Sequence, residues 1–154
     1  MTRINCTIII SLAAIYCISC NNHRPKLERP DGMPALHPCS VEVTFGGQII
    51  EGVVASLTPE DGSKWGASGS TDKTGTAVMS TSYGFKGVPI GKYTVAFVRI
   101  IQNPDFNDND PKSMPFCSLI PAKYGEGKSK ETLEITVGKN SFTFVLDAGE
   151  EFVK

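Results

Sequence analysis

Oxygen-bearing side chains are concentrated in the segment NPDFNDNDP, at Asp105, Asn107, Asp108, Asn109 and Asp110. Carboxylate and amide oxygens at alternate positions suit Ca²⁺, which exported proteins meet outside the cell. The spacing departs from an EF-hand, because Asp110 occupies the glycine position and Phe116 stands where a bidentate glutamate is needed. The sequence therefore gives Asp105, Asn107, Asp108 and Asp110 as candidate calcium ligands, but it favours the alternative of a solvated loop whose Asn and Asp residues make turns.

Residues that commonly serve in catalysis lack the partners they would need. The two histidines, His23 and His37, lie in a proline-rich segment ahead of the first strand pattern. No serine lies in a Gly-x-Ser-x-Gly elbow, and Cys39 and Cys117 have no histidine partner in the part expected to fold. We therefore predict a protein that is not an enzyme and that uses no cofactor.

The single tryptophan, Trp65, is the candidate residue for carbohydrate binding. The flat face of an indole can pack against a sugar ring, but a lone tryptophan in a β-rich domain more often belongs to the core. Exposure of Trp65 separates the two hypotheses, because a buried indole offers no face to a sugar.

The first 19 residues have the three zones of an export signal. Arg3 supplies a positive charge, residues 6–18 (CTIIISLAAIYCI) are almost wholly apolar, and a small residue, Ser19, precedes Cys20. The apolar run is shorter than the roughly 20 residues of a spanning helix. We therefore predict a cleaved signal over residues 1–19, with the cut before Cys20.

The end of this signal resembles the lipobox of bacterial lipoproteins, in which the cysteine after a small residue is acylated and becomes the mature N-terminus. The resemblance implies that Cys20 carries the lipid, although Cys17 stands where leucine is usual. Two or three acyl chains hold a protein firmly on a membrane, since each buried methylene contributes about 0.8 kcal/mol. Asn21 replaces the aspartate of the family's inner-membrane retention signal, which favours the outer membrane, facing the periplasm or the cell surface. The alternative is an ordinary secretory signal with an incidental Cys20.

Two of the five cysteines, Cys39 and Cys117, remain in the part expected to fold. Exported thiols tend to be oxidised, so we expect one disulfide between them. The alternative is two separate thiols, because a bridge requires the two backbones to come within bridging distance.

Residues 20–38 form a predicted flexible tether, because they contain four prolines and mixed charges without any periodicity. The chain as a whole carries 15 basic and 16 acidic residues, a balance that argues against nucleic acid as a partner. We expect one folded domain over residues 39–148 and a short tail over residues 149–154.

Apolar and polar residues alternate through most of the predicted domain, as in half-buried strands. The patterns are VEVTF, IIEGVVASLTP, a short stretch over residues 65–70, GTAVMST, KYTVAFVRII, LEITV and SFTFVLD. Turn residues separate them, among them Gly46 with Gly47 and the TDKTG stretch at residues 71–75. We therefore predict an all-β fold, a seven-stranded antiparallel β-sandwich.

The order of these segments resembles the transthyretin-like, carboxypeptidase-regulatory-like domain of many small bacterial lipoproteins. TDKTG, GKY before the central strand and IPAKY ahead of the last two strands carry the resemblance. It implies a prealbumin-like sandwich without a catalytic centre, in which residues 106–117 look like an inserted loop. Transthyretin-like folds include hydroxyisourate hydrolases, but this chain has no histidine on a strand pattern and lacks their C-terminal Tyr-Arg-Gly-Ser motif.

Two functions follow as hypotheses. In the first, the chain is a lipid-anchored, non-catalytic domain of the cell envelope that binds another envelope protein, through its surface or an exposed sheet edge. In the second, it binds a carbohydrate or calcium through Trp65 and the Asp105–Asp110 segment.

Overall fold

A computed structural model describes residues 28–147 of the chain as an all-β fold. The predicted signal, Cys20 and the predicted tail 149–154 lie outside the described residues. Thirteen strands and one 3₁₀ turn are present in the described part, where the alternation of the sequence predicts seven longer strands. Turns within the predicted segments divide them, as at Gly52, whose positive φ of 80° lets the chain bend between two strands.

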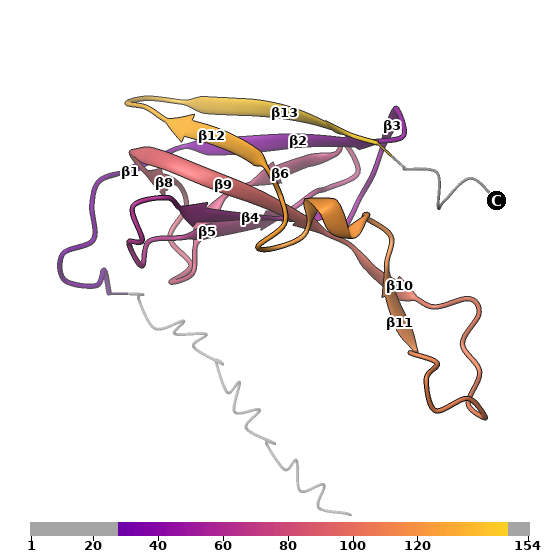
Figure 1. Cartoon of the computed structure of the whole chain (residues 1–154). Helices are drawn as coiled ribbons and strands as arrows, with labels where there is room; N and C mark the ends of the chain where they lie inside the picture. The colour runs from indigo at the N-terminus through magenta and orange to yellow at the C-terminus, as the bar shows by residue number, and fades with distance from the viewer. Residues whose placement is uncertain (1–27, 148–154) are drawn as a thin grey trace, which may run out of the picture.

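Two main sheets pack on each other in a β-sandwich-like arrangement (Figure 1). The larger sheet has the strand order β12-β9-β4-β5-β7, with the bounds Glu131–Ile135, Gly91–Val98, Val54–Pro59, Ala67–Ser70 and Ser80–Thr81. The smaller sheet places β2 in the middle, paired with β13 on one side and with β3 and β6 on the other. Its strands span Cys39–Phe45 (β2), Asn140–Leu146 (β13), Gln48–Ile49 (β3) and Thr76–Val78 (β6).

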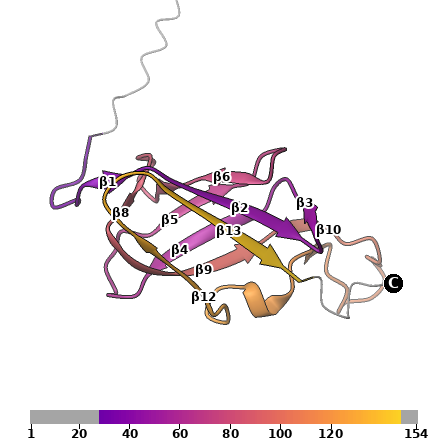
Figure 2. The ribbon, with the colours of Figure 1, turned by 90° about the horizontal axis from the view of Figure 1, so that it is seen from above.

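The pairing of β13 with β2 is parallel, from Asn140 opposite Cys39 to Leu146 opposite Phe45. The sequence predicts antiparallel sheets only, and this pair differs because the last strand returns beside the first long strand in the same direction (Figure 2). The other strand pairs in the described part are antiparallel. The smaller sheet is therefore closed by a contact between segments about a hundred residues apart.

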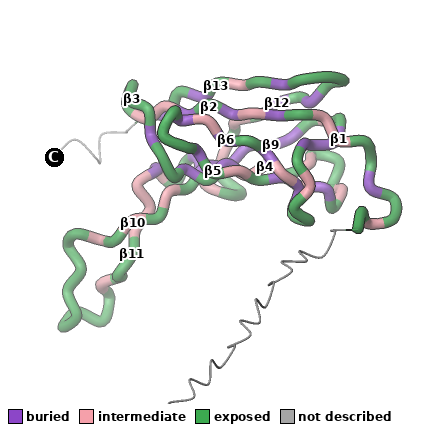
Figure 3. Tube along the Cα trace, turned by 180° about the vertical axis from the view of Figure 1, so that it is seen from behind, coloured by how far each residue is buried: buried purple, intermediate pink, exposed green. Residues whose placement is uncertain are grey.

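The core lies between the two sheets and contains the apolar side of each alternating pattern (Figure 3). Its members from the long strands are Cys39, Val41, Val43, Ala55, Leu57, Tyr93, Val95, Phe97, Leu133, Ile135, Phe144 and Leu146. Phe97 of the larger sheet meets Phe144 of the smaller one at 5.1 Å between ring centroids, tilted by 59°. Such tilted aromatic pairs contribute beyond their buried area. On the opposite side of β9, Ala96 is buried, whereas Val98 is 36% exposed.

Two short strand pairs lie outside the main sheets. Strand β1 (Leu36–His37) pairs with β8 (Val88–Pro89), which places the end of the predicted tether within the fold. Strand β10 (Ile100–Gln102) pairs with β11 (Phe116–Ser118). The 3₁₀ turn η1 (Ala122–Tyr124) follows β11 and leads back toward β12.

The TDKTG turn combines two devices that the sequence predicts. Asp72 accepts hydrogen bonds at its carboxylate from the Thr74 and Thr76 backbone N–H groups, at 2.8 and 3.2 Å. Gly75 adopts a φ of 76°, which suits a residue without a side chain. The Thr74 hydroxyl also donates to the Asp72 carboxylate, at 2.6 Å, and it lowers the pKa of Asp72 most, followed by the two backbone N–H groups. Asp72 is thus a turn-forming residue.

Thr71, at the start of this turn, fixes the chain segment before β4. It is 3% exposed, and its hydroxyl donates to the Ile50 carbonyl at 2.7 Å while accepting from the Val53 N–H at 2.9 Å. Buried backbone groups lose stability when they are left without a partner. This single side chain therefore satisfies both a donor and an acceptor of the bend between β3 and β4.

Replacing Thr71 by valine keeps the shape of the side chain but removes both hydrogen bonds. We expect Thr71→Val to lower the free energy of unfolding by about 2 to 4 kcal/mol, because the Ile50 carbonyl and the Val53 N–H stay buried without their partner. Thr132→Val, at an exposed position of β12, should change it by less than about 0.5 kcal/mol. Denaturant unfolding followed by Trp65 fluorescence measures both, and equal values for the two variants would contradict this role.

Candidate functional site

The β10–β11 pair forms a ribbon, residues 100–118, that projects from the sandwich (Figure 1). It begins after Arg99, whose carbonyl accepts a hydrogen bond from the Leu119 N–H at 2.8 Å and so closes the ribbon at its root. In its antiparallel register Ile100 lies opposite Ser118, and Gln102 lies opposite Phe116. The ribbon is a separate two-stranded sheet, because its strands pair with each other and with neither main sheet.

Large apolar side chains of the ribbon are exposed to solvent. Ile100 is 61% exposed, Phe116 62% and Met114 67%. Ser118 is the partner of Ile100, and Phe116 lies two positions before Ser118 on the same strand. Alternate residues of a strand point to the same side, so Ile100 and Phe116 lie on the same face of the ribbon. An isolated exposed apolar residue needs no explanation, but several gathered on a projecting element are typical of a protein-binding surface. Figure 3 shows the ribbon as mostly exposed, in contrast to the buried stretches of the sandwich.

The loop between the two strands of the ribbon is built from successive turns. Asn103, Asn107 and Asp110 each accept, through a side-chain oxygen, the backbone N–H of the residue two positions later. Such side-chain oxygens stabilise turns. Within residues 28–147, no group of three or more His, Cys, Asp or Glu side chains comes together in a way that could hold a metal ion. The candidate calcium ligands Asp105, Asn107, Asp108 and Asp110 thus lie in a solvent-exposed loop of turns.

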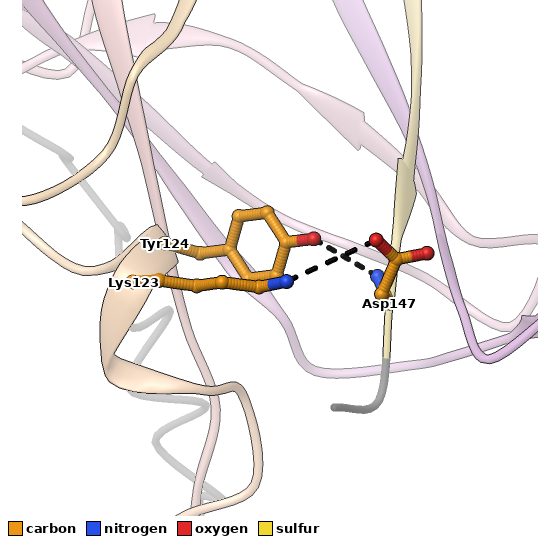
Figure 4. A network of polar contacts seen from close by, with 3 residues as sticks. All are labelled: Lys123, Tyr124 and Asp147. Atoms are coloured by element: carbon orange, nitrogen blue, oxygen red, sulfur yellow. Dashed lines mark hydrogen bonds and ion pairs between the residues drawn. The ribbon is translucent and has the colours of Figure 1, made fainter. Parts of the chain in front are cut away.

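A polar contact holds η1, the turn that follows the ribbon, to the end of β13 (Figure 4). The Tyr124 hydroxyl accepts a hydrogen bond from the Asp147 N–H at 3.0 Å, and Lys123 Nζ lies 3.8 Å from the Asp147 carboxylate. This bond joins η1 to the end of the last strand. The exposed ion pair adds little to stability. The hydrogen bond is accepted by a tyrosine that is only 7% exposed, so it is better shielded from water.

Beside the root of the ribbon lies an open hollow of about 430 Å³. Its lining comes from the end of β9, from Ser118 of the ribbon and from the segment around η1. Ile120 at its base is 2% exposed and belongs to the core. The ribbon and this hollow together offer a convex and a concave surface side by side.

Trp65 does not offer a face to a ligand. It is 8% exposed, and the ring of Tyr83 lies 5.6 Å from its own between centroids. The ammonium group of Lys64 lies 4.7 Å from the indole centroid, in the range of a cation–π contact. Trp65 is therefore a packing residue next to β5, and the carbohydrate hypothesis loses its stacking platform.

The predicted disulfide between Cys39 and Cys117 is not formed in the structure, where both residues are free thiols. Cys39 begins β2, at the end of the sandwich where β1 and β8 lie, and Cys117 is part of the ribbon, which projects from the opposite end (Figures 1 and 2). Burial raises the pKa of the Cys39 thiol to about 11. Sequence position alone cannot show this separation, because it depends on where the ribbon leaves the sandwich.

The ribbon is the element that the sequence predicts least well. Residues 106–117 resemble an inserted loop, but the exposure of Ile100, Met114 and Phe116 is not foreseen. A signal was present: RIIQ and FCS flank a loop rich in Asn, Asp and Pro, which is typical of a hairpin. Exposure, however, follows only from the absence of a neighbouring strand.

No protein-family model matches the chain, and neither a curated protein nor a solved structure is significantly similar to it. Within the described residues, no helix has the length and hydropathy to cross a membrane.

The two thiols of the described part should differ in reactivity toward iodoacetamide at pH 8. We expect Cys117, which is partly exposed, to be alkylated at least tenfold faster than Cys39, which is 3% exposed and holds its proton until about pH 11. Peptide mass spectrometry separates the two sites, and unfolding in denaturant should make their rates similar. Protection of both residues, reversed only by a reductant, would instead show that a disulfide forms between them.

Proposed function

We propose that this chain is a lipid-anchored, non-catalytic protein of the bacterial cell envelope that binds another envelope protein through its ribbon. The observation that carries the proposal is the exposure of Ile100, Met114 and Phe116 on one projecting element. Water solvates such side chains poorly, so their burial against a partner would be favourable by roughly 1.5 to 3 kcal/mol each at full burial.

The anchor in this proposal is the acyl group on Cys20. It is supported by the apolar run over residues 6–18, by the small Ser19 that follows it, and by the resemblance of this stretch to a lipobox. The segment between Cys20 and β1 would separate the sandwich from the membrane surface, with the outer membrane favoured by Asn21. The membrane and a second protein would thus be the two partners of the chain.

The proposal also includes a transthyretin-like, carboxypeptidase-regulatory-like domain with a seven-stranded prealbumin-like core. The segments that carry the resemblance support it by their roles in the fold: TDKTG makes the turn before β6, and GKY begins the long strand β9. The all-β, sandwich-like arrangement is compatible with this family. The extra short strands β1, β8, β10 and β11 would then be additions to its core.

The chemistry of the ribbon indicates the kind of partner. Between Asn103 and Pro115, the ribbon loop contains three aspartates and one lysine, so it is acidic as well as apolar. An acidic loop disfavours insertion into a membrane of anionic lipids. A protein with an apolar cleft and basic residues at its rim is complementary to both features.

The proposal of a non-catalytic protein is supported by the hydrogen bonding of His37 and by the burial of Cys39. His37 already accepts a hydrogen bond at Nδ1 from the Gly138 N–H, at 3.1 Å. Cys39 is buried, and its raised pKa keeps the thiol protonated at neutral pH, where the thiolate would be the nucleophile. Neither residue is arranged as an activated catalytic group.

The anchor is tested by the intact mass of the protein from membranes of its native host. We expect a mature chain that begins at Cys20 with added acyl mass, and a Cys20→Ala variant without that mass. Recovery of an unmodified chain, cut elsewhere and found in the soluble fraction, would contradict the lipid anchor.

The ribbon is tested by placing a photo-crosslinking amino acid at position 114 in the native host. We expect a discrete crosslinked protein band that decreases at least fivefold with Phe116→Ser, because this change removes most of the apolar surface beside the probe. Val145→Ser, at a position of β13 that is 67% exposed, is the matched control and should keep the band. Equal crosslinking in both variants, or crosslinking to lipid only, would overturn the role of the ribbon.

A further inference from the structure

A groove of about 300 Å³ lies at the end of the smaller sheet, across three of its strands. Cys39 and Ser40 of β2 line its middle, Val78 and Met79 line it from β6 and the residue after it, and Asn140 lines it from β13. The strands are held together here by the register that places Ser40 opposite both Val78 and Ser141. This groove begins where β2 begins, away from the ribbon, so it is independent of the surface proposed above.

The floor of the groove is apolar and neutral. Met79 is fully buried and Cys39 is 3% exposed, so both lie just beneath the surface of the groove and contribute almost no accessible area themselves. Val78 is 61% exposed on the outer side of the sheet and adds an aliphatic wall. A thiol that remains protonated behaves as a small apolar group. The floor therefore favours a hydrocarbon chain and presents no charge of its own.

The rim of the groove is positively charged. Lys86 and Lys139 both line it and are exposed, and no aspartate or glutamate is among its lining residues. Neither lysine has an ion-pair partner within the described residues, where the single ion pair joins Lys123 and Asp147. The stem of a lysine covers apolar surface while its ammonium group stays at the water boundary. Two unpaired cations thus lie beside an apolar floor.

Asn140 fixes the loop that carries one of these lysines. Its amide group donates to the carbonyls of Thr136 and Gly138, both at 3.0 Å, and its side-chain oxygen accepts from the Thr136 N–H at 3.0 Å. These bonds hold the turn between β12 and β13, with Lys139 at its end. Asn140 is consequently a positioning residue, and the lysines are the groups free to meet a ligand.

We infer that this groove binds an alkyl chain that ends in a carboxylate. The chain would lie on Val78 and on the aliphatic stems of the two lysines, above the buried Met79 and Cys39, and the carboxylate would meet the ammonium groups of Lys86 and Lys139. The choice of an anionic end group follows from charge complementarity, since the rim has two positive charges and no negative one. A volume of about 300 Å³ is at the lower limit of small-molecule sites, which suits a short or medium single chain.

Methionine methyl groups provide a direct test with octanoate as the probe. The full chain, reconstituted in phospholipid nanodiscs, is labelled with [methyl-¹³C]methionine, and octanoate is titrated at pH 7. We expect a saturable shift of the Met79 signal, assigned by its loss in Met79→Leu, and no shift of Met114 on the ribbon. Octan-1-ol has the same chain without the charge and should bind at least tenfold more weakly.

The lysines are tested with a matched pair of double variants. Lys86→Ala with Lys139→Ala should weaken octanoate binding at least tenfold, whereas Lys73→Ala with Lys92→Ala, at exposed positions outside the groove, should leave it within twofold. All four positions are exposed, so the fold should be retained and the unshifted Met114 signal reports this. The inference is overturned if Met79 does not shift, if Met79 and Met114 shift together without saturation, or if octanol binds as tightly as octanoate.

Discussion

The parallel pairing of β13 with β2 is the interaction on which the other features of the fold depend. It joins residues 140–146 to residues 39–45 over seven register positions. This contact brings Phe144 and Leu146 over the core, where Phe144 meets Phe97 of the opposite sheet. Asp147, the residue after the pairing ends, donates its N–H to the Tyr124 hydroxyl. A contact between such distant segments has to offset the entropic cost of closing a long loop.

The two ends of the sandwich differ in shape and in charge as a result. At one end, the start of β2 and the start of β13 lie side by side and form the groove with the residues after β6. At the other end, β9 continues beyond the larger sheet into the ribbon, which returns through η1 and is held by Tyr124. The first end has a groove with a basic rim, and the second has the projecting apolar and acidic ribbon beside an open hollow. The two proposed binding surfaces therefore do not overlap.

Strand positions and facing were largely predictable, because the alternation of side chains follows directly from the geometry of a strand. Val41 and Val43, or Leu133 and Ile135, are buried as their spacing indicates. The turns were predictable as well, since Gly46 and Gly47 take the positive φ values, 56° and 78°, that a two-glycine hairpin requires. It was harder to predict the roles of Trp65, Asp105 and Cys117, because these roles depend on which residues from elsewhere in the chain lie near them.

By itself, the sequence determined the all-β class, the faces of the long strands and the composition of the turns, because each of these depends on neighbours within a few residues. Only the tertiary structure decided that Trp65 is covered, that Cys39 and Cys117 are separate thiols and that Lys86 and Lys139 share a groove. It also decided that Ile100 and Phe116 remain in water while similar residues of β9 are buried. The physical reason is that the burial and the contacts of a side chain depend on packing between distant segments. An alternating pattern predicts a strand, but it does not predict whether a second sheet covers that strand.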